Sequence, residues 1–167
     1  MNFATPETIK QPKGNLILED LTETDYILGS KDPKNIGKVV VEDGHWARFA
    51  PIPELQRALD GNTFGCAAFA DNNVDEFIHR AKYGTEINIS DRFVAVGSGT
   101  VRGVGNSMKA AAEFKRKNGF LFEDEYSFTQ QMTLDQFYAK ISQELYTKAK
   151  EKLQTYSTGY LFTDGVG

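Results

Sequence analysis

Cys66 is the only cysteine of the chain, and its sequence setting suits a nucleophile. It stands in the run Asn62-Thr63-Phe64-Gly65-Cys66-Ala67-Ala68, where an apolar period typical of a helix begins. The positive end of a helix dipole favours thiolate over thiol, so a cysteine in the first turn is expected to be a primed nucleophile. The competing interpretation is a small apolar core residue, the commonest role of a free cysteine.

A helix that would position Cys66 is predicted from the residues that follow it. Apolar side chains recur at steps of three and four and form one stripe: Ala67, Ala70, Val74, Phe77, Ile78 and Ala81. The polar residues between them fall largely off this stripe: Asp71, Asn72, Asp75 and Glu76. Gly84 is a natural stop, and Asn62 or Thr63 can accept hydrogen bonds from the first free amides.

Three further helices are predicted along the chain. Ser90 is placed to cap a short helix that runs to Val96. Another begins near residues 106–107 and ends at Asn118-Gly119, a pair that a left-handed C-cap favours. Residues 133–136 form a capping box, and apolar residues then recur at four-residue steps, which predicts one continuous helix: Phe137, Ile141, Leu145, Ala149 and Leu153.

A short β-hairpin is expected before the first helix. Val39-Val40-Val41-Glu42 is typical of a strand, and Asp43-Gly44 is a strong two-residue turn signal leading into the run from His45 to Phe49. Residues 1–35 are polar and carry prolines, so we interpret them as an N-terminal arm that orders only against something else. The run from Tyr156 to Phe162 could start another strand.

The composition is that of an ordinary globular protein. The 167 residues are 40% hydrophobic and 25% charged, which suits one domain with its own core. A net charge of −4 provides no broad basic field for nucleic acid, and the basic run Lys115-Arg116-Lys117 falls at a predicted helix end, where cations suit the dipole. No apolar run is long enough to cross a bilayer, and no signal peptide is visible. We therefore expect no nucleic-acid or membrane partner.

Metal and phosphate sites are not expected either. The two histidines, His45 and His79, and the single cysteine show no metal-binding spacing. The glycine-rich run from Gly97 to Gly105 lacks a following Gly-Lys-Ser/Thr step, so we interpret it as a connection between two helices. We predict no metal and no cofactor, and an intracellular location because one cysteine cannot form an internal disulfide.

Five motifs follow one another in a distinctive order: a loop with Gln56, a helix headed by Cys66, the helix start Ser90-Asp91, the helix start Gly105-Asn106, and the turn Lys117-Asn118-Gly119 before an acidic-aromatic segment that ends at Tyr126. This order resembles the N-terminal, helical half of a papain-like cysteine peptidase, and most of all the divergent versions carried by bacteriophages. The resemblance implies that Cys66 is the nucleophile and Gln56 the oxyanion-hole glutamine. It also implies that the fourth of these motifs and the residues just before it touch the substrate backbone, through Gly103, Gly105 and Asn106.

The resemblance implies an α+β fold, a mainly helical papain-like left domain over residues 36–167 with a short N-terminal β-hairpin and with the right β domain absent. The best-known papain signature places Cys-Gly-Ser before the nucleophile and an aromatic residue after it, whereas Gly65 precedes Cys66 here and Ala67 follows. The ten-residue spacing from Gln56 to Cys66 is longer than in papain itself. Asn62 is therefore a rival oxyanion donor.

The histidine that a papain-like cysteine needs lies about 130 to 150 residues after the nucleophile in this family, beyond residue 167 here. His79 lies thirteen residues after Cys66 on the same predicted helix and points away from the thiol. His45 would reach the cleft only through an unusual arrangement. We therefore expect a peptidase fragment that hydrolyses peptide or isopeptide bonds when a histidine and an asparagine from outside this chain complete it.

Two other interpretations remain open. A catalytically inactive phage virion, structural or binding protein could use the same half-fold, with other virion proteins as partners, as the missing histidine and the arm suggest. A small helical domain without peptidase kinship would bury Cys66 in its core. For the preferred interpretation the expected partner is a peptide or protein substrate, and the expected location is the host cytoplasm or the virion.

Overall fold

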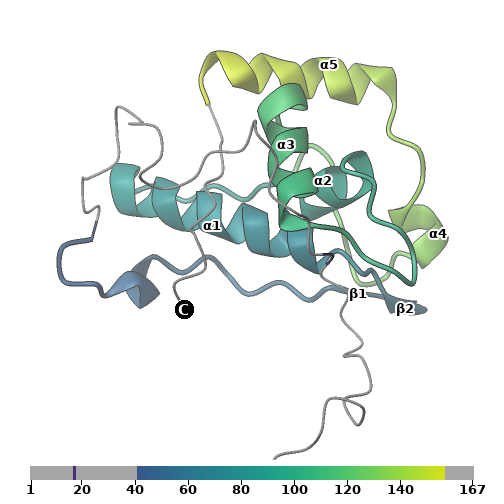
Figure 1. Cartoon of the computed structure of the whole chain (residues 1–167), viewed down its shortest axis with the longest axis horizontal. Coiled ribbons are helices and arrows are strands. Elements are labelled where there is room, and N and C mark those ends of the chain that lie inside the picture. The colour runs from purple at the N-terminus through teal and green to yellow at the C-terminus, as the bar shows by residue number, and fades with distance from the viewer. Residues whose placement is uncertain (1–16, 18–40, 157–167) are drawn as a thin grey trace, which may run out of the picture.

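The computed structural model describes Ile17 and residues 41–156 of the chain. A 3-10 helix and a two-stranded hairpin precede the long helix that Cys66 begins, and the elements follow in this order: η2 (Trp46–Phe49), β1 (Arg57–Ala58), β2 (Gly61–Asn62), α1 (Cys66–Tyr83), α2 (Asp91–Gly97), α3 (Met108–Asn118), α4 (Leu134–Phe137), α5 (Gln143–Glu151) and the 3-10 helix η3 (Lys152–Gln154). α2 and α3 stand against one side of α1, and α5 covers α3 (Figure 1). The fold is α+β and mainly helical, as predicted from the sequence.

The ends of the first three α-helices lie where the sequence predicts them. Ser90 and Ser107 cap α2 and α3, each accepting a hydrogen bond from the amide three residues on. Gly84 ends α1 with a φ of 70°, and Gly119 ends α3 with a φ of 76°. These ends are set locally, because a cap satisfies the amides and carbonyls that a helix leaves free.

The core lies among α1, α2, α3, α5 and the segment between α3 and α4. Aromatic rings make much of it, and Phe93 of α2 contacts Phe114 of α3 with ring centroids 5.4 Å apart. The buried cluster comprises Ala68, Ile89, Phe93, Val94, Ala95, Ala111, Phe114, Phe120, Leu121, Phe137, Ile141 and Ala149. Residues 88–90 pair with the segment after α3, where Ser90 N donates to Leu121 O at 2.8 Å.

α1 does not bury the apolar stripe that the sequence shows. Val74 is 52% exposed and Ile78 is 43% exposed, and Ala70 is exposed as well. The buried residues of α1 are Ala67, Ala68, Phe69, Asn72 and Glu76. The helix therefore presents a partly polar face to α2 and α3 and leaves much of its apolar stripe in solvent.

The two buried polar side chains on the inward face of α1, Asn72 and Glu76, each form a hydrogen bond to the chain before α2 or at its start. Asn72 Nδ2 donates to Asp91 Oδ1 at 2.8 Å, and Glu76 Oε1 accepts a hydrogen bond from the Ile89 amide at 2.7 Å. Both contacts hold the chain at the start of α2. Buried polar side chains are tolerated when they are hydrogen-bonded in this way, and sequence periodicity alone cannot reveal such partners.

A buried ion cluster joins α1 to α3. Lys115 is 1% exposed, and its Nζ lies 2.9 Å from Asp71 Oδ2 and 2.5 Å from Asp75 Oδ2. From the sequence, the run Lys115-Arg116-Lys117 is interpreted as a solvated helix end. That interpretation is wrong for Lys115, because its ammonium group is neutralised by carboxylates of the neighbouring helix.

The continuous helix predicted from Thr133 onward is two helices. The capping box at Thr133 is present, but α4 ends at Phe137, and Ser142 caps a separate helix, α5. The guanidinium of Arg92 reaches across from α2, where Nε donates to Phe137 O at 3.0 Å and Nη2 donates to Gln136 O. These bonds satisfy carbonyls that a longer helix would have used, so the helix ends there.

The hairpin forms later in the chain than predicted. β1 and β2 pair antiparallel with Arg57 opposite Asn62, whereas the run from His45 to Phe49 contains the 3-10 helix η2 in place of the predicted strand. The turn at Asp43-Gly44 is present, but the Asp43 carboxylate accepts a hydrogen bond from the His45 amide at 3.0 Å, and the chain continues directly into η2. Residues 39 and 40 lie outside the described residues.

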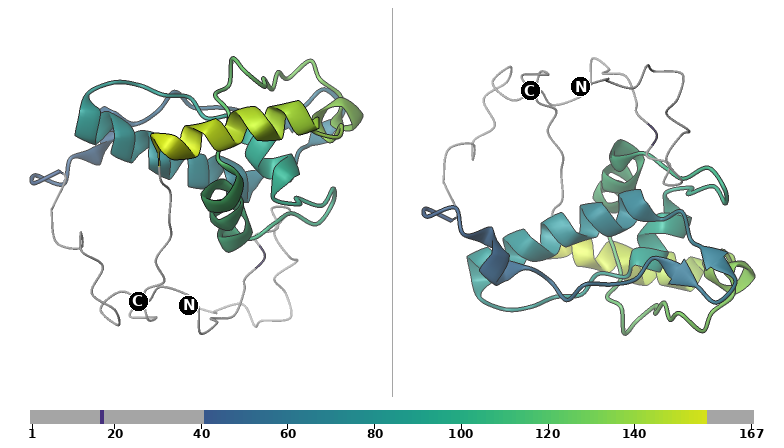
Figure 2. Two further views of the ribbon diagram at one scale, coloured as in Figure 1. Left: turned by 90° about the horizontal axis from the view of Figure 1, so that it is seen from above. Right: turned by 90° about the horizontal axis from the view of Figure 1, so that it is seen from below.

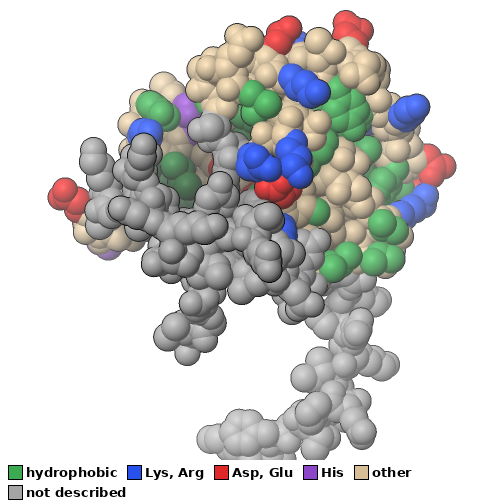
Figure 3. Space-filling view, turned by 45° about the horizontal axis from the view of Figure 1, so that its top comes forward, with side chains coloured by type: hydrophobic (Ala, Val, Ile, Leu, Met, Phe, Trp, Pro, Cys, Tyr) green, Lys and Arg blue, Asp and Glu red, His purple; other side chains and the backbone are tan. Residues whose placement is uncertain are grey.

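The predicted arm, residues 1–35, and the predicted strand from Tyr156 to Phe162 lie almost entirely outside the described residues. Of the arm, Ile17 is described, and its amide donates to Asn106 O at 3.0 Å. Within the described part of the chain, no helix combines the length and apolar character that a bilayer crossing requires. On the face seen in Figure 3, the Lys and Arg side chains stand in separate groups among acidic and apolar ones.

Candidate active site

Cys66 is the first residue of α1, and Gly65 is the N-cap. Because Gly65 has no side chain, no side-chain oxygen caps this helix, and the first bonded amide is that of Phe69, which donates to Gly65 O at 3.1 Å. The amides of Cys66, Ala67 and Ala68 have no acceptor among the described residues. Free amides and the positive dipole end make this position suited to an anion. The thiol is free and partly exposed.

The hairpin returns Gln56 to the start of α1. Gln56 O accepts hydrogen bonds from Thr63 N at 3.1 Å and from Thr63 Oγ1 at 3.0 Å. The hairpin of β1 and β2 forms the segment between Gln56 and Thr63. Gln56 therefore lies beside the start of α1 despite the ten-residue spacing from Gln56 to Cys66. Thr63 is fully buried and Gln56 is partly exposed. The role of the Gln56 side chain at an oxyanion stays a prediction.

The turn just before Cys66 has an uncommon backbone. Phe64 has a φ of 54°, which is sterically costly for a residue with a side chain. Asn62 Oδ1 holds this turn by accepting from the Phe64 amide at 2.7 Å, and Thr63 Oγ1 accepts from the Gly65 amide at 3.4 Å. Asn62 and Thr63 thus satisfy the amides immediately before the helix rather than those of its first turn.

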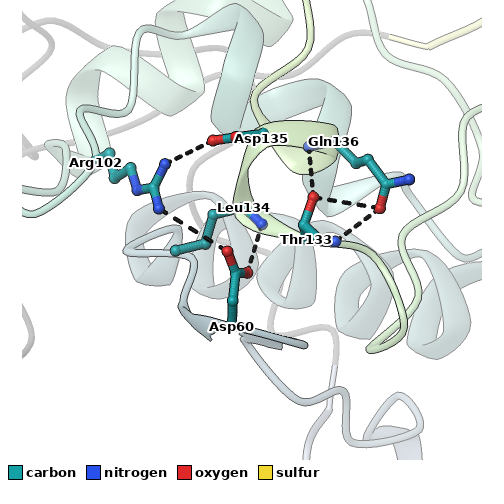
Figure 4. A network of polar contacts seen from close by, with 6 residues as sticks. All are labelled: Asp60, Arg102, Thr133, Leu134, Asp135 and Gln136. Atoms are coloured by element: carbon teal, nitrogen blue, oxygen red, sulfur yellow. Dashed lines mark hydrogen bonds and ion pairs between the residues drawn. The ribbon is translucent and has the colours of Figure 1, made fainter.

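A segment far along the chain holds the hairpin in place (Figure 4). Asp60 Oδ1 in the hairpin turn accepts from the Leu134 amide at 2.7 Å. Arg102, from the loop after α2, lies 2.8 Å from Asp135 Oδ1 and 4.0 Å from Asp60 Oδ2. The start of α4 and the glycine-rich loop therefore both contact the turn that leads to Cys66.

Tyr138 adds a contact closer to Cys66. Its hydroxyl donates to Thr63 O at 2.5 Å across a sequence separation of 75 residues. Burial raises the pKa of Tyr138, so the phenol stays protonated as a donor. Tyr138, Asp60 and Arg102 carry no signal in the sequence for this role, because their contribution depends on contacts between distant segments.

The predicted substrate-contacting residues fall in the loop between α2 and α3. Gly103 is exposed with a φ of 81°, and Gly105 is buried. The Asn106 side chain is 7% exposed and bonds within the loop, donating to Ser98 Oγ at 2.8 Å and accepting from the Ser107 amide at 2.8 Å. These bonds shape the loop, and contact of the three residues with a substrate stays a prediction.

Both histidines lie at the end of α1 away from Cys66. His79 follows Cys66 by thirteen residues on α1, a distance of about 20 Å along a helix, and its Nδ1 lies 3.0 Å from Thr85 O. His45 precedes η2, which packs near the same end, since Arg80 Nη1 donates to Ala50 O at 2.9 Å. Figure 2 shows η2 and the hairpin at opposite ends of α1. Neither imidazole can serve as base for the thiol in this arrangement.

Buried carboxyl groups gather at the start of α2. Asp91 is 4% exposed, and burial together with the neighbouring Glu54 raises its pKa to about 9. Burial also raises the pKa of Glu76 and of Glu123, each to about 7. Among the described residues, no group of three or more side chains is arranged to hold a metal ion.

No protein-family model matches the sequence, and no curated protein matches it significantly. Among solved structures, the chain is similar to xylellain, a cysteine protease from Xylella fastidiosa, with a TM-score of 0.54 and 19% identity over 91% of this chain. This chain has a papain-like fold. A second match is the proform of the Amb a 11 cysteine protease, a ragweed pollen allergen, with a TM-score of 0.38 and 21% identity over 53% of this chain. The papain-like chain spans 59% of xylellain and 31% of Amb a 11.

Proposed function

We propose that this chain carries the nucleophile of a papain-like cysteine peptidase and is its N-terminal helical half, of the divergent type carried by bacteriophages. The observation that carries the proposal is the position of Cys66 as the first residue of α1 in a papain-like fold, where the amides of residues 66–68 have no acceptor among the described residues. The similar structures are those of cysteine proteases, and the motif order of the sequence supports the finer assignment.

The proposed chemistry begins when the Cys66 thiolate attacks the carbonyl carbon of a peptide or isopeptide bond. The carbonyl oxygen becomes an oxyanion, which would accept hydrogen bonds from the Cys66 amide and from the Gln56 side chain. The C–N bond then breaks, and the amine leaves with a proton from an imidazolium. Water hydrolyses the resulting thioester, which releases the acid and restores the thiol.

The imidazole in this proposal comes from outside the chain, since His45 and His79 both lie far from Cys66. The exposed apolar stripe of α1 supports a second domain that packs on that face of the helix. Val74 and Ile78 are exposed in this chain, and a domain that covered them would remove their apolar surface from water. A right β domain with the histidine and asparagine fits both requirements.

The test is the rate at which iodoacetamide alkylates Cys66 at pH about 6.5, compared with glutathione under the same conditions. We expect alkylation at least about tenfold faster than that of glutathione, because the sulfur stands at the positive end of the α1 dipole, which stabilises negative charge on an attacking nucleophile. The Cys66→Ser variant is the blank. A rate equal to that of glutathione would contradict the proposed nucleophile, whatever the fate of the second domain.

A second candidate is favoured by the distance of both histidines from the thiol. In it the chain is a catalytically inactive virion, structural or binding protein that keeps the half-fold, with other virion proteins as partners. Peptide hydrolysis by the protein isolated from its natural source separates the two. Hydrolysis that iodoacetamide abolishes supports the peptidase, and its absence despite a fast-reacting thiol supports the inactive scaffold in the host cytoplasm or virion.

A further inference from the structure

Two adjoining hollows form one groove beside the start of α2. The larger has a volume of about 660 Å³ and lies between residues 86–88 and 122–129. The smaller has a volume of about 390 Å³ and lies between residues 53–55 and 128–130. Both are lined by Glu123, Phe128 and Thr129, so we treat them as one feature, the acidic groove. Its size suits several side chains of a bound peptide.

The charge of the acidic groove has one sign. The acidic side chains that line it are Glu54, Glu86, Asp91, Glu123 and Asp124, and no Lys, Arg or His is among the described residues that line it. Asp91 adds no charge near pH 7, because burial and the neighbouring Glu54 raise its pKa to about 9. The Glu86 carboxylate forms an ion pair with Arg80 at 2.7 Å, and the Glu54 carboxylate accepts a hydrogen bond from Asn88 Nδ2 at 2.9 Å. Within the described chain, Glu123 and Asp124 have no ion-pair partner. The groove is therefore complementary to a cation.

Glu123 has an unused acceptor. Its Oε1 accepts a hydrogen bond from the Phe128 amide, whereas Oε2 is buried and has no hydrogen-bond partner among the described residues. An unpaired buried carboxylate oxygen is costly, and burial is what raises the pKa of Glu123 to about 7. Because Oε2 is not accessible from the groove, a cation bound there would act on Glu123 through its charge rather than through a direct hydrogen bond to Oε2.

The groove also has apolar walls, which a small inorganic cation would not use. Ile87, Phe122 and Phe128 line the larger hollow. Leu55 lines the smaller hollow and is 64% exposed, and the neighbouring Ile52 is 74% exposed. Exposed apolar side chains beside unpaired carboxylates match an occupant that alternates basic and apolar side chains.

We propose that the acidic groove binds a segment of another protein in which Lys or Arg alternates with large apolar residues. The basic side chains meet Glu123 and Asp124, and the apolar side chains pack on Leu55 and Phe128. This proposal does not rest on the chemistry of Cys66, and the Cys66→Ser variant should bind the same segment with unchanged affinity.

The experiment measures the fluorescence polarisation of a fluorescein-labelled peptide of alternating lysine and leucine residues as the full chain is titrated in. We expect saturable binding that weakens as salt rises from about 0.05 M to about 0.3 M, because charge pairs at a partly open groove are screened. A peptide of alternating glutamate and leucine should not bind, and one of alternating lysine and serine should bind more weakly.

Variants locate the binding site. The double variant Glu123→Gln with Asp124→Asn removes the charge, and Leu55→Ser removes the exposed apolar contact; each should weaken binding about fivefold or more. Glu151→Gln, an exposed carboxylate on α5, is the matched control and should leave affinity unchanged. Equal affinity for all variants, or no binding by the wild type, overturns the proposal. Concentration-dependent dimers lost in the same variants would assign the groove to a second copy instead.

Discussion

Replacing Gly119 by alanine adds only one methyl group, but it should strongly disrupt the packing of α5 on α3. Gly119 has a φ of 76° and a ψ of −163°, a region that is essentially restricted to glycine. A Cβ added there would lie 1.9 Å from Ala149 O and 2.6 Å from Ala149 C, which are backbone atoms of α5. A backbone carbonyl inside a helix cannot swing away as a flexible side chain can.

The expected cost follows from these two effects. The backbone conformation costs about 1 to 3 kcal/mol for a residue with a Cβ, and overpacking against a fixed neighbour adds about 1 to 3 kcal/mol. Gly119→Ala should therefore lower the free energy of unfolding by about 4 kcal/mol. Urea unfolding followed by circular dichroism measures it, and the midpoint should fall without a change in the slope.

Gly84→Ala is the matched control. Gly84 also has a positive φ, 70°, but nothing lies within 4 Å of the position of its added Cβ. Only the left-handed conformation is penalised there, so the expected loss is about 1 kcal/mol. If the two variants lose the same stability within about 1 kcal/mol, the contact between Gly119 and α5 does not constrain the fold, and the reasoning is refuted.

Three further predictions concern charge and positioning. Lys115→Met leaves the partly buried carboxylates of Asp71 and Asp75 without their cation. It should cost about 3 kcal/mol in urea unfolding, the low end for breaking a buried ion pair, and a cost under about 1 kcal/mol would contradict a structural role for the buried ammonium. The melting temperature should be lower at pH 8 than at pH 5, by about 10 °C or more, in differential scanning calorimetry. The reason is that Glu76 and Glu123 have pKa values raised to about 7 in the folded protein, whereas the unfolded chain releases the same protons near pH 4.5. The stability from these two groups is therefore full below pH 4.5 and is lost as the pH rises through 7. A melting temperature that stays flat or rises with pH would contradict this prediction. Tyr138→Phe removes the hydrogen bond to Thr63 O. It should lower the free energy of unfolding by about 1 kcal/mol and slow the alkylation of the Cys66 thiol, and an unchanged alkylation rate would contradict this prediction.

Local signals predicted much of the secondary structure. Ser90 and Ser107 cap helices because their hydroxyls reach amides only three residues away, and Gly84 and Gly119 end helices because glycine tolerates a positive φ. The start of α1 at Cys66 follows from the apolar period that begins there, although neither Asn62 nor Thr63 caps the helix as predicted. The hairpin that forms turns at Leu59 and Asp60, which are not a strong two-residue turn signal, whereas Asp43-Gly44 is one.

Long-range contacts overruled the periodic patterns elsewhere. The helix from Thr133 stops at Phe137 because Arg92, from another helix, bonds its last carbonyls. The polar side of α1 faces inward because Asn72 and Glu76 find partners at residues 89 and 91. A hydrophobic period cannot anticipate either result, since both depend on groups that folding brings together.

The sequence by itself determined where Cys66 stands on its helix, because a helix start is a property of neighbouring residues. The tertiary structure decided what surrounds the thiol. It returned Gln56 to Thr63 through the hairpin, placed Tyr138 against the same residue, and left both histidines at the far end of α1. Distances between segments far apart in sequence are set by the packing of the whole chain, and the surroundings of a nucleophile consist of such distances.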